Sequence, residues 1–239
     1  MKSLLRKLVL AALVFVFAES ASADLDSAVT AYNERDYKSA LSMFAPLAKA
    51  GNNVARTYLG HMYFAGYYVP QDREMAVDYY VTAASEGHVP AQIILGQIYY
   101  AGKGVSRDYG EAVKWFRLAA NQGRLDAQVV LADLYAHNPK MSDPPEAAKW
   151  YRTAAEQGDA SAQYSLALLY LEGKGVSKDF VQAHKWLHLA SRSSPMPYLA
   201  TTYALKRDAV AADMTPSQIA EAQQLAAGWR PTTSDDPRQ

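Results

Sequence analysis

The chain has 239 residues, and its 24 basic and 24 acidic side chains give a formal net charge of zero. This balance, without a basic cluster, argues against a nucleic-acid-binding protein. Because no cysteine is present, disulfides, thiol catalysis and thiolate metal sites are excluded, and packing must supply the stability.

Residues 1–23 have the layout of a secretory signal peptide. Lys2, Arg6 and Lys7 precede an apolar stretch from Leu8 to Ala18, and Ala21-Ser22-Ala23 is a cleavage sequence. As a helix, the apolar stretch would rise only about 16 Å, well short of the roughly 30 Å hydrocarbon core, so a retained membrane anchor is the weaker alternative. We expect cleavage after Ala23 and a periplasmic or secreted mature chain with a net charge of −2. No Asn-x-Ser/Thr sequence occurs, which favours a bacterial exported protein.

Residues 24–51 are expected to form a capping repeat at the start of the fold. In its short interhelical loop, the segment from Tyr32 to Leu41 resembles a tetratricopeptide repeat. Further along it is in register with the chain that follows, because Ala40 and Gly51 lie 36 residues before Ala76 and Gly87.

One phrase then recurs at an almost fixed period. It reads Ala-Arg-Thr-Tyr-Leu-Gly at 55–60, Ala-Gln-Ile-Ile-Leu-Gly at 91–96, Ala-Gln-Val-Val-Leu-Ala at 127–132 and Ala-Gln-Tyr-Ser-Leu-Ala at 162–167. The starts lie 36, 36 and 35 residues apart. A period of this size indicates stacked helix pairs, and such arrays usually bind other molecules rather than transform them.

Each unit is predicted to hold two antiparallel helices, here called the A helix and the B helix. In the clearest unit the A helix covers about 90–101 and the B helix about 109–122, with a turn over 102–108. Aspartates at the N-cap position are expected to start the B helices, and glycines to end them. The aspartates are 72, 108, 143 and 179, and the glycines are 51, 87, 123 and 158.

Alternating small and large residues predict dense packing between the helices. Alanines recur at 76, 112, 147 and 183, and rings recur at Tyr63, Tyr99, Tyr135 and Tyr170 and at Tyr79, Trp115, Trp150 and Trp186. Such rings could also stack on a sugar or a cofactor. Their strict periodicity favours a structural role in the core.

These motifs resemble the Sel-one-like repeat (SLR) family, a relative of the tetratricopeptide repeat. The pattern A-x-x-x-L-G-x-x-Y-x-x-G-x-G-V-x-x-D-x-x-x-A-x-x-W-Y-x-x-A-A-x-x-G fits residues 91–123 almost throughout, and 55–87 and 162–190 closely. The resemblance implies an all-α, right-handed superhelical solenoid of antiparallel helix pairs, with four SLR repeats over 52–194. It also implies an adaptor or scaffold in protein complexes.

Two parts of the chain depart from the repeat. The loop from Ala136 to Pro145 lacks the glycines and is one residue shorter; it is either degenerate or a projection for a partner. Residues 195–229 are expected to form two C-terminal capping helices, about 198–213 and then 215–229, the second starting with Thr215, Pro216 and Gln218. The polar residues 230–239 are expected to be disordered.

The sequence offers no catalytic constellation. His184 and His188 share one helix face at spacing i, i+4, but no third metal ligand lies nearby in sequence, so a surface pair is the preferred interpretation. Neither Gly-x-Ser-x-Gly nor Ser-x-x-Lys occurs, and Gly102-Lys-Gly and Gly173-Lys-Gly lack the spacing of a phosphate loop. We therefore predict no enzyme, no metal and no cofactor.

A face of the A helices remains after packing, and it is the predicted partner-binding groove. Ala91, Leu95 and Ile98 share one side of their helix, so Ile93, Gln97 and Tyr100 lie on the other. By the family resemblance, the A helices line the concave side. Two alternatives stay open: a groove for a peptide, or a face that winding or the terminal helix buries. The predicted groove residues are Thr57, His61, Phe64, Ile93, Gln97, Tyr100, Val129, Asp133, Tyr164, Leu168 and Leu171.

The sequence therefore predicts a non-catalytic scaffold or adaptor of the bacterial envelope. Its partner would be an envelope or membrane protein bound through the concave A-helix face, without nucleic acid and without stable membrane insertion after cleavage. Two alternatives are an exported hydrolase of β-lactam type and a secreted factor that binds a host protein. The hydrolase is disfavoured because the exported relatives to which that activity is ascribed carry regularly spaced cysteine pairs, and this chain has no cysteine and no Ser-x-x-Lys.

Overall fold

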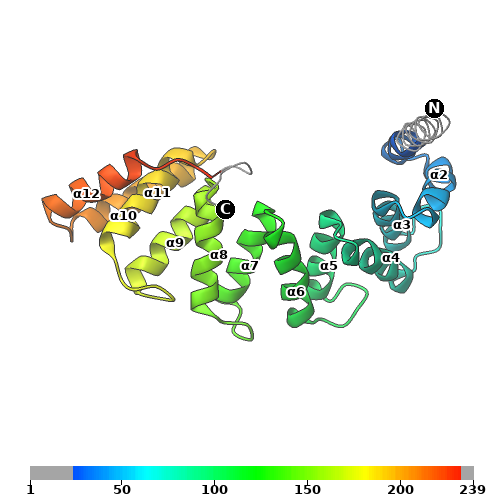
Figure 1. Ribbon diagram of the computed structural model, residues 1–239, viewed down its shortest axis with the longest axis horizontal. Coiled ribbons are helices and arrows are strands. Elements are labelled where there is room, and N and C mark those ends of the chain that lie inside the picture. Colours follow the sequence, from blue (N-terminus) through cyan, green and yellow to red (C-terminus); the bar gives the residue numbers. More distant parts are fainter. Residues whose placement is uncertain (1–23, 233–239) are drawn as a thin grey trace, which may run out of the picture. The chain divides into compact units, whose positions relative to one another are not determined.

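The computed structural model describes residues 24–232, and within that range every regular element is a helix (Figure 1). The signal peptide predicted over 1–23 and the tail over 233–239 lie outside the described residues. The chain divides into a first unit, which ends at Asp108, and a second unit, which begins at Tyr109. No helix among the described residues is both long and apolar enough to cross a membrane.

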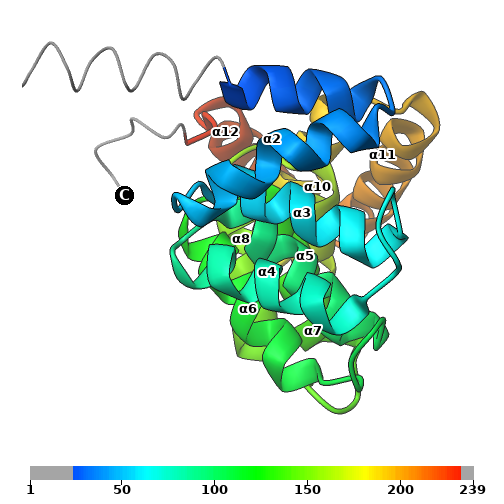
Figure 2. The same ribbon diagram turned by 90° about the vertical axis from the view of Figure 1, so that its right-hand side faces the viewer.

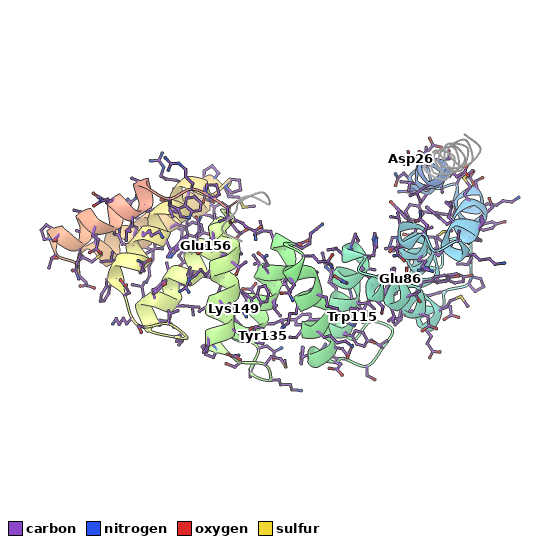
Figure 3. All side chains as sticks on the ribbon, in the orientation of Figure 1. Asp26, Glu86, Trp115, Tyr135, Lys149 and Glu156 are labelled. Atoms are coloured by element: carbon purple, nitrogen blue, oxygen red, sulfur yellow. The ribbon has the colours of Figure 1, made fainter. Side chains whose placement is uncertain are left out.

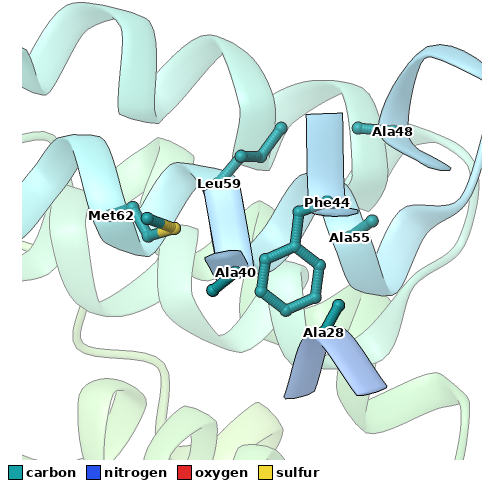
Figure 4. Packing of buried hydrophobic residues seen from close by; sticks show 7 residues of the cluster. All are labelled: Ala28, Ala40, Phe44, Ala48, Ala55, Leu59 and Met62. Atoms are coloured by element: carbon teal, nitrogen blue, oxygen red, sulfur yellow. The ribbon is translucent and has the colours of Figure 1, made fainter. Parts of the chain in front are cut away.

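The first unit consists of helical residues 24–33 followed by four helices. These are α2 (Tyr37–Lys49), α3 (Asn53–Ala65), α4 (Arg73–Ser85) and α5 (Val89–Ala101). In both views α2 lies beside α3 (Figure 1, Figure 2). Their buried side chains form one cluster with the first helix, shown in Figure 4: Ala28, Ala40, Phe44, Ala48, Ala55, Leu59 and Met62.

The second unit holds the remaining seven described helices. These are α6 (Tyr109–Asn121), α7 (Leu125–His137), α8 (Pro144–Glu156), α9 (Ala160–Glu172), α10 (Phe180–Ser193), α11 (Pro197–Ala211) and α12 (Pro216–Ala227). Consecutive helices pack against each other from α6 to α7 and onward from α7 to α11, and α10 also packs against α12 (Figure 1). The repeat helices predicted at about 90–101 and 109–122 are confirmed to within one residue by α5 and α6.

Local sequence explains where the helices begin and end. The carboxylates of Asp72, Asp143 and Asp179 accept hydrogen bonds from backbone N–H groups three residues later, at 2.9, 3.2 and 3.0 Å. This side-chain capping satisfies donors that a helix start leaves without a partner. The predicted capping box of Thr215 and Gln218 is present at the start of α12.

The second loop glycine of the repeat is required by a close approach to the preceding B helix. A Cβ atom on Gly175 would lie 2.1 Å from the carbonyl oxygen of Pro144, and one on Gly104 would lie 2.8 Å from the Cβ atom of Arg73. Both glycines also have positive φ, at 71° and 86°. Space and backbone conformation therefore both favour glycine here.

The glutamine of the recurring Ala-Gln pair has a structural role that the sequence analysis did not assign. Gln92, Gln128 and Gln163 are buried, and each donates its side-chain amide N–H to a carbonyl near the end of the preceding B helix, at 3.1, 3.2 and 3.1 Å. In the first repeat Arg56 donates to the Ala48 carbonyl at 3.3 Å. Each side chain satisfies an acceptor that a helix end leaves open.

Four of the eight periodic rings are buried as predicted, whereas Tyr63, Tyr79, Tyr99 and Tyr170 are only partly buried. Trp115, Trp150 and Trp186 are at most 5% exposed, and Tyr135 is equally buried. Arg117 on α6 donates to the Tyr135 hydroxyl on α7, and Arg152 on α8 donates to the Tyr170 hydroxyl on α9 at 2.7 Å. Figure 3 shows Trp115, Tyr135 and Lys149 among the side chains of the second unit.

Two sequence expectations are wrong in the C-terminal part. His184 is only 3% exposed and not part of a surface pair, because α11 and α12 pack against α10. Residues 230–232 are not a free tail, because the Thr232 N–H donates to the Glu156 carbonyl at 2.7 Å and Pro231 lies beside Gly158. Residues 230–232 therefore pack against the C-terminal end of α8.

Candidate functional site

The first unit contains a cavity of about 610 Å³ formed by three helices and one loop. Helices α3 and α5 supply most of the lining, α4 contributes Tyr80, and the loop after α5 contributes Lys103. The lining is mostly apolar and has no carboxylate. It consists of Thr57, Tyr58, His61, Phe64, Tyr80, Ile94, Gln97, Ile98, Tyr100, Ala101 and Lys103.

Five of the six groove residues predicted for this unit lie in the lining. Thr57, His61 and Phe64 come from α3, and Gln97 and Tyr100 come from α5. The helical spacings i, i+4 and i+7, or i and i+3, place each set on one side of its helix. Three of them are exposed at the surface, namely His61, Gln97 and Tyr100, and Tyr100 is 47% exposed.

The sixth predicted residue, Ile93, is not in the lining, and its neighbour Ile94 is. Tyr58 and Lys103 also line the cavity and were not predicted. One residue on a helix turns the side chain by about 100°, so a face chosen from one helix alone can be off by one position. Lys103 belongs to the Gly102-Lys-Gly turn, whose direction periodicity does not predict.

His61 connects the cavity to a group of tyrosines. Its Nδ1 atom is hydrogen-bonded to the Tyr32 hydroxyl, and burial lowers the pKa of His61, so the neutral ring is favoured. Burial, with repulsion from neighbouring Tyr37 and Tyr67, raises the pKa of Tyr32 to about 12. A neutral imidazole and a protonated phenol form a fixed pair beside the cavity.

The aromatic rings around Tyr32 hold this side of the first unit in place. Tyr32 meets Tyr58 edge to face with ring centroids 4.9 Å apart, and Tyr58 stacks on Phe44 at 4.8 Å. Tyr37 and Tyr67 stack at 4.5 Å. Interlocked rings of this kind restrict side-chain motion, so the cavity wall is formed before any partner arrives.

The edge of the cavity is positively charged. Lys103 belongs to the lining, and the guanidinium of Arg73 lies over the Phe64 ring at 5.7 Å from its centroid. Together these groups create an apolar surface with a basic edge. It is suited to apolar side chains, and it lacks a carboxylate that could act as an acid or base within the lining.

The groove residues predicted in the second unit have different surroundings. Val129, Leu168 and Leu171 are partly buried, and exposed Asp133 accepts a hydrogen bond from the Tyr151 hydroxyl. Tyr164 stacks on Tyr203 of α11 with centroids 4.5 Å apart. A capping helix therefore covers part of this face, as one of the two alternatives expected.

The histidine pair on α10 has no third potential metal ligand gathered beside it in the part of the chain that the structure describes. Among residues 24–232 no three histidine, aspartate or glutamate side chains gather where an ion could be held. Burial lowers the pKa of His184 and of His188, and the charge of Arg207 lowers both further. The Nδ1 atom of His184 has no hydrogen-bond partner in the described part of the chain.

The fold is that of an array of antiparallel helix pairs, and comparison with known proteins assigns it to a family. The Sel1 repeat model matches residues 54–88, 89–123, 125–159 and 160–194, which is more than half of the chain. The chain belongs to the Sel1 repeat family. Its members are generally scaffolds for protein interactions and typically not enzymes, and the repeats mediate contacts between proteins.

One of the solved structures that the chain resembles shows the same architecture. A Sel1 repeat protein from Oxalobacter formigenes is 27% identical, with a TM-score of 0.68, and the match covers 85% of this chain and 84% of that one. A protective antigen with an SLR fold from uropathogenic Escherichia coli is 26% identical, with a TM-score of 0.47, over 86% of this chain and 52% of that one. A comparison with curated proteins gives no match.

Proposed function

We propose that this protein is a non-catalytic adaptor that binds a partner protein through the A-helix face, with the cavity of the first unit as the main anchoring point. The observation that carries the proposal is the lining itself, where α3 and α5 place Thr57, His61, Phe64, Gln97 and Tyr100 around one apolar cavity. The interaction role of the Sel1 family supports it.

Aromatic and apolar side chains in a preformed cavity supply most of the affinity in protein interfaces. The fixed pair of His61 and Tyr32 and the stacked rings behind it reduce the cost of ordering the surface on binding. The groups at the edge, Gln97 and Lys103, then orient the partner through polar contacts. An exposed apolar segment of the partner is the natural occupant.

We further propose that the protein works in the periplasm or outside the cell. The support is the signal-peptide layout of residues 1–23, with its basic start, apolar stretch and cleavage sequence. Cell fractionation and mass spectrometry of the purified chain test this. An N-terminus at Asp24 in an exported fraction is expected, and an intact leader on a cytoplasmic chain contradicts it.

Site-specific photocrosslinking tests the adaptor proposal directly. A photoreactive amino acid at Gln97, which is exposed within the lining, is expected to give a discrete adduct in cells that express the protein at its native level. The same amino acid at Glu74, which is exposed on α4 and outside the lining, serves as the matched control. Equal adducts at both positions contradict a role for the cavity.

Two substitutions of exposed tyrosines separate the cavity from other surfaces. Tyr100→Ala removes an anchor from the lining and is expected to weaken partner binding by about tenfold or more. Tyr198→Ala removes a tyrosine of α11 that is 66% exposed and is expected to leave binding unchanged. Affinity is measured with the crosslinked partner once identified, and circular dichroism confirms that both variants are folded. Weaker binding by Tyr198→Ala together with unchanged binding by Tyr100→Ala would show that the cavity is not the anchoring point.

A further inference from the structure

A second cavity, distinct from the proposed partner site, lies between α10 and α12 in the second unit. It has a volume of about 580 Å³. Helix α10 contributes His188, Leu189, Arg192 and Ser193, and α12 with the residues after it contributes Gln223, Ala226, Ala227, Trp229 and Arg230. No Sel1 motif residue requires this arrangement, because α12 lies beyond the last matched repeat at 160–194.

The charged side chains of this lining are all of one sign. Arg192 and Arg230 are cationic, and no aspartate or glutamate is in the lining. The ion pairs of the described residues include neither arginine. By contrast, Arg207 on the adjacent α11 is paired with Asp208 at 2.6 Å. Within residues 24–232, two guanidinium groups in a lining without a carboxylate form an anion-binding environment.

The C-terminal ends of α10 and α12 lie at this cavity and are partly negative, so they disfavour an anion. Their charge must be compared with that of the two arginines. The last turns of α10 and α12 each carry about half a negative charge, so together they offset about one of the two positive charges. Arg230 itself donates through Nη1 to the carbonyls of Ala227 and Trp229, at 3.0 and 2.6 Å, and so neutralises one helix end. A net positive charge remains.

His188 in the lining is also subject to positive charges. Burial lowers the pKa of His188, and the positive charges of Arg207 and Arg192 lower it further. The only acidic side chain that acts on this histidine pair from α11 is Asp208, through His184, and it is already paired with Arg207. The charged side chains that act on the His188 ring are therefore both cationic.

We propose that the cavity between α10 and α12 binds the oxyanion group, phosphate or carboxylate, of a small organic molecule. Arg192 and Arg230 would supply the charge. The Gln223 amide would supply a further hydrogen-bond donor, while Trp229 offers an apolar wall to the organic part. The Trp229 ring is held edge-on against Trp186, with centroids 6.3 Å apart, so this wall is preformed. The volume exceeds what a bare oxyanion needs, which leaves room for the group attached to it.

Binding is tested on the mature chain, residues 24–239, by NMR at constant ionic strength. The probes are phenyl phosphate, phenylacetate, inorganic phosphate and the neutral benzyl alcohol. We expect saturable shifts of the Trp229 indole N–H signal, assigned with Trp229→Phe, for at least one organic anion and none for benzyl alcohol. Phenyl phosphate and phenylacetate distinguish a phosphate from a carboxylate as the preferred group. Absence of saturable shifts with every anion overturns the proposal.

Variants with the same change of charge locate the site. Arg192→Gln is expected to lower the affinity for the anion at least fivefold. Lys206→Gln, at an exposed position of α11 outside the lining, is expected to leave the affinity unchanged. Arg230→Gln gives a second test, with circular dichroism to check α12, since this arginine also contacts the helix end. Equal affinities of the Arg192 and Lys206 variants would mean that the anion binds elsewhere.

Discussion

At the scale of single residues, the repeat motif is explained by contacts between one unit and the next. The second loop glycine lies against the start of the preceding B helix. The buried glutamine donates a hydrogen bond to a backbone carbonyl at the end of a preceding B helix. Tyr68 stands 36 residues before Gly104 and keeps a positive φ of 61°. It is 60% exposed, so its large side chain meets no packing limit there.

Gly175→Ala is expected to lower the free energy of unfolding by about 2 kcal/mol or more, because a Cβ would collide with the Pro144 carbonyl and φ is positive. Gly228→Ala is the matched control. Its φ is −79° and its nearest non-neighbouring atom would lie 3.5 Å from the new Cβ, so a change within about 0.5 kcal/mol is expected. Urea unfolding measures both. Equal costs would contradict the role of the close approach.

Gln128→Leu is expected to destabilise the fold by about 1–3 kcal/mol. The substitution leaves the Ala120 carbonyl without its side-chain donor and removes the acceptor of the Gln157 amide, which lies 2.7 Å away. Gln224→Leu changes an exposed glutamine of α12 and is expected to have little effect. Chemical denaturation measures the unfolding free energy of both variants. An unchanged unfolding free energy in Gln128→Leu would show that water replaces the hydrogen bonds of the Gln128 side chain.

At the scale of helices, neighbouring pairs were predictable because their contacts join segments close in sequence. Asp72 and Asp179 mark helix starts and Gly87 and Gly123 follow helix ends, and all four signals are local. The partial covering of Tyr164 and the burial of His184 were not predictable in the same way. Both are covered by helices that follow the repeats and carry no repeat pattern.

Tyr203→Ala tests the covering of the second unit by α11. Tyr203 is buried and stacks on Tyr164, so we expect a loss of about 3–5 kcal/mol in unfolding free energy. Leu205→Ala, at a position of the same helix that is 66% exposed, should change stability by less than about 0.5 kcal/mol. Thermal and urea unfolding report both values. Equal effects would mean that α11 does not pack through Tyr203.

At the scale of the molecule, four histidines link stability to pH. Burial lowers the pKa of His61, His88, His184 and His188 below the ordinary value of 6.5. The unfolded chain therefore binds more protons than the folded chain once the pH falls through 6.5. The stability contributed by the neutral rings is complete above this value and is lost as the pH falls toward the folded pKa values.

We expect the unfolding free energy to decrease between about pH 7.5 and about pH 5, with a smaller decrease in His184→Gln. Each repeat contacts mainly its neighbours, so the transition should be followed by circular dichroism and tryptophan fluorescence together. Stability that rises on acidification, or an unchanged slope in the variant, would show that these histidines do not control the effect.

The sequence by itself determined the repeats, the positions of their helices, four buried rings of the core and five of the lining residues of the first cavity. All of these depend on spacings of a few residues or on a period near 36. Only the tertiary structure decided that Tyr58 and Lys103 join that lining, that α11 covers Tyr164, and that Arg192 and Arg230 share a cavity. The physical reason is that burial and charge at these positions depend on loops and capping helices, whose packing direction no period encodes.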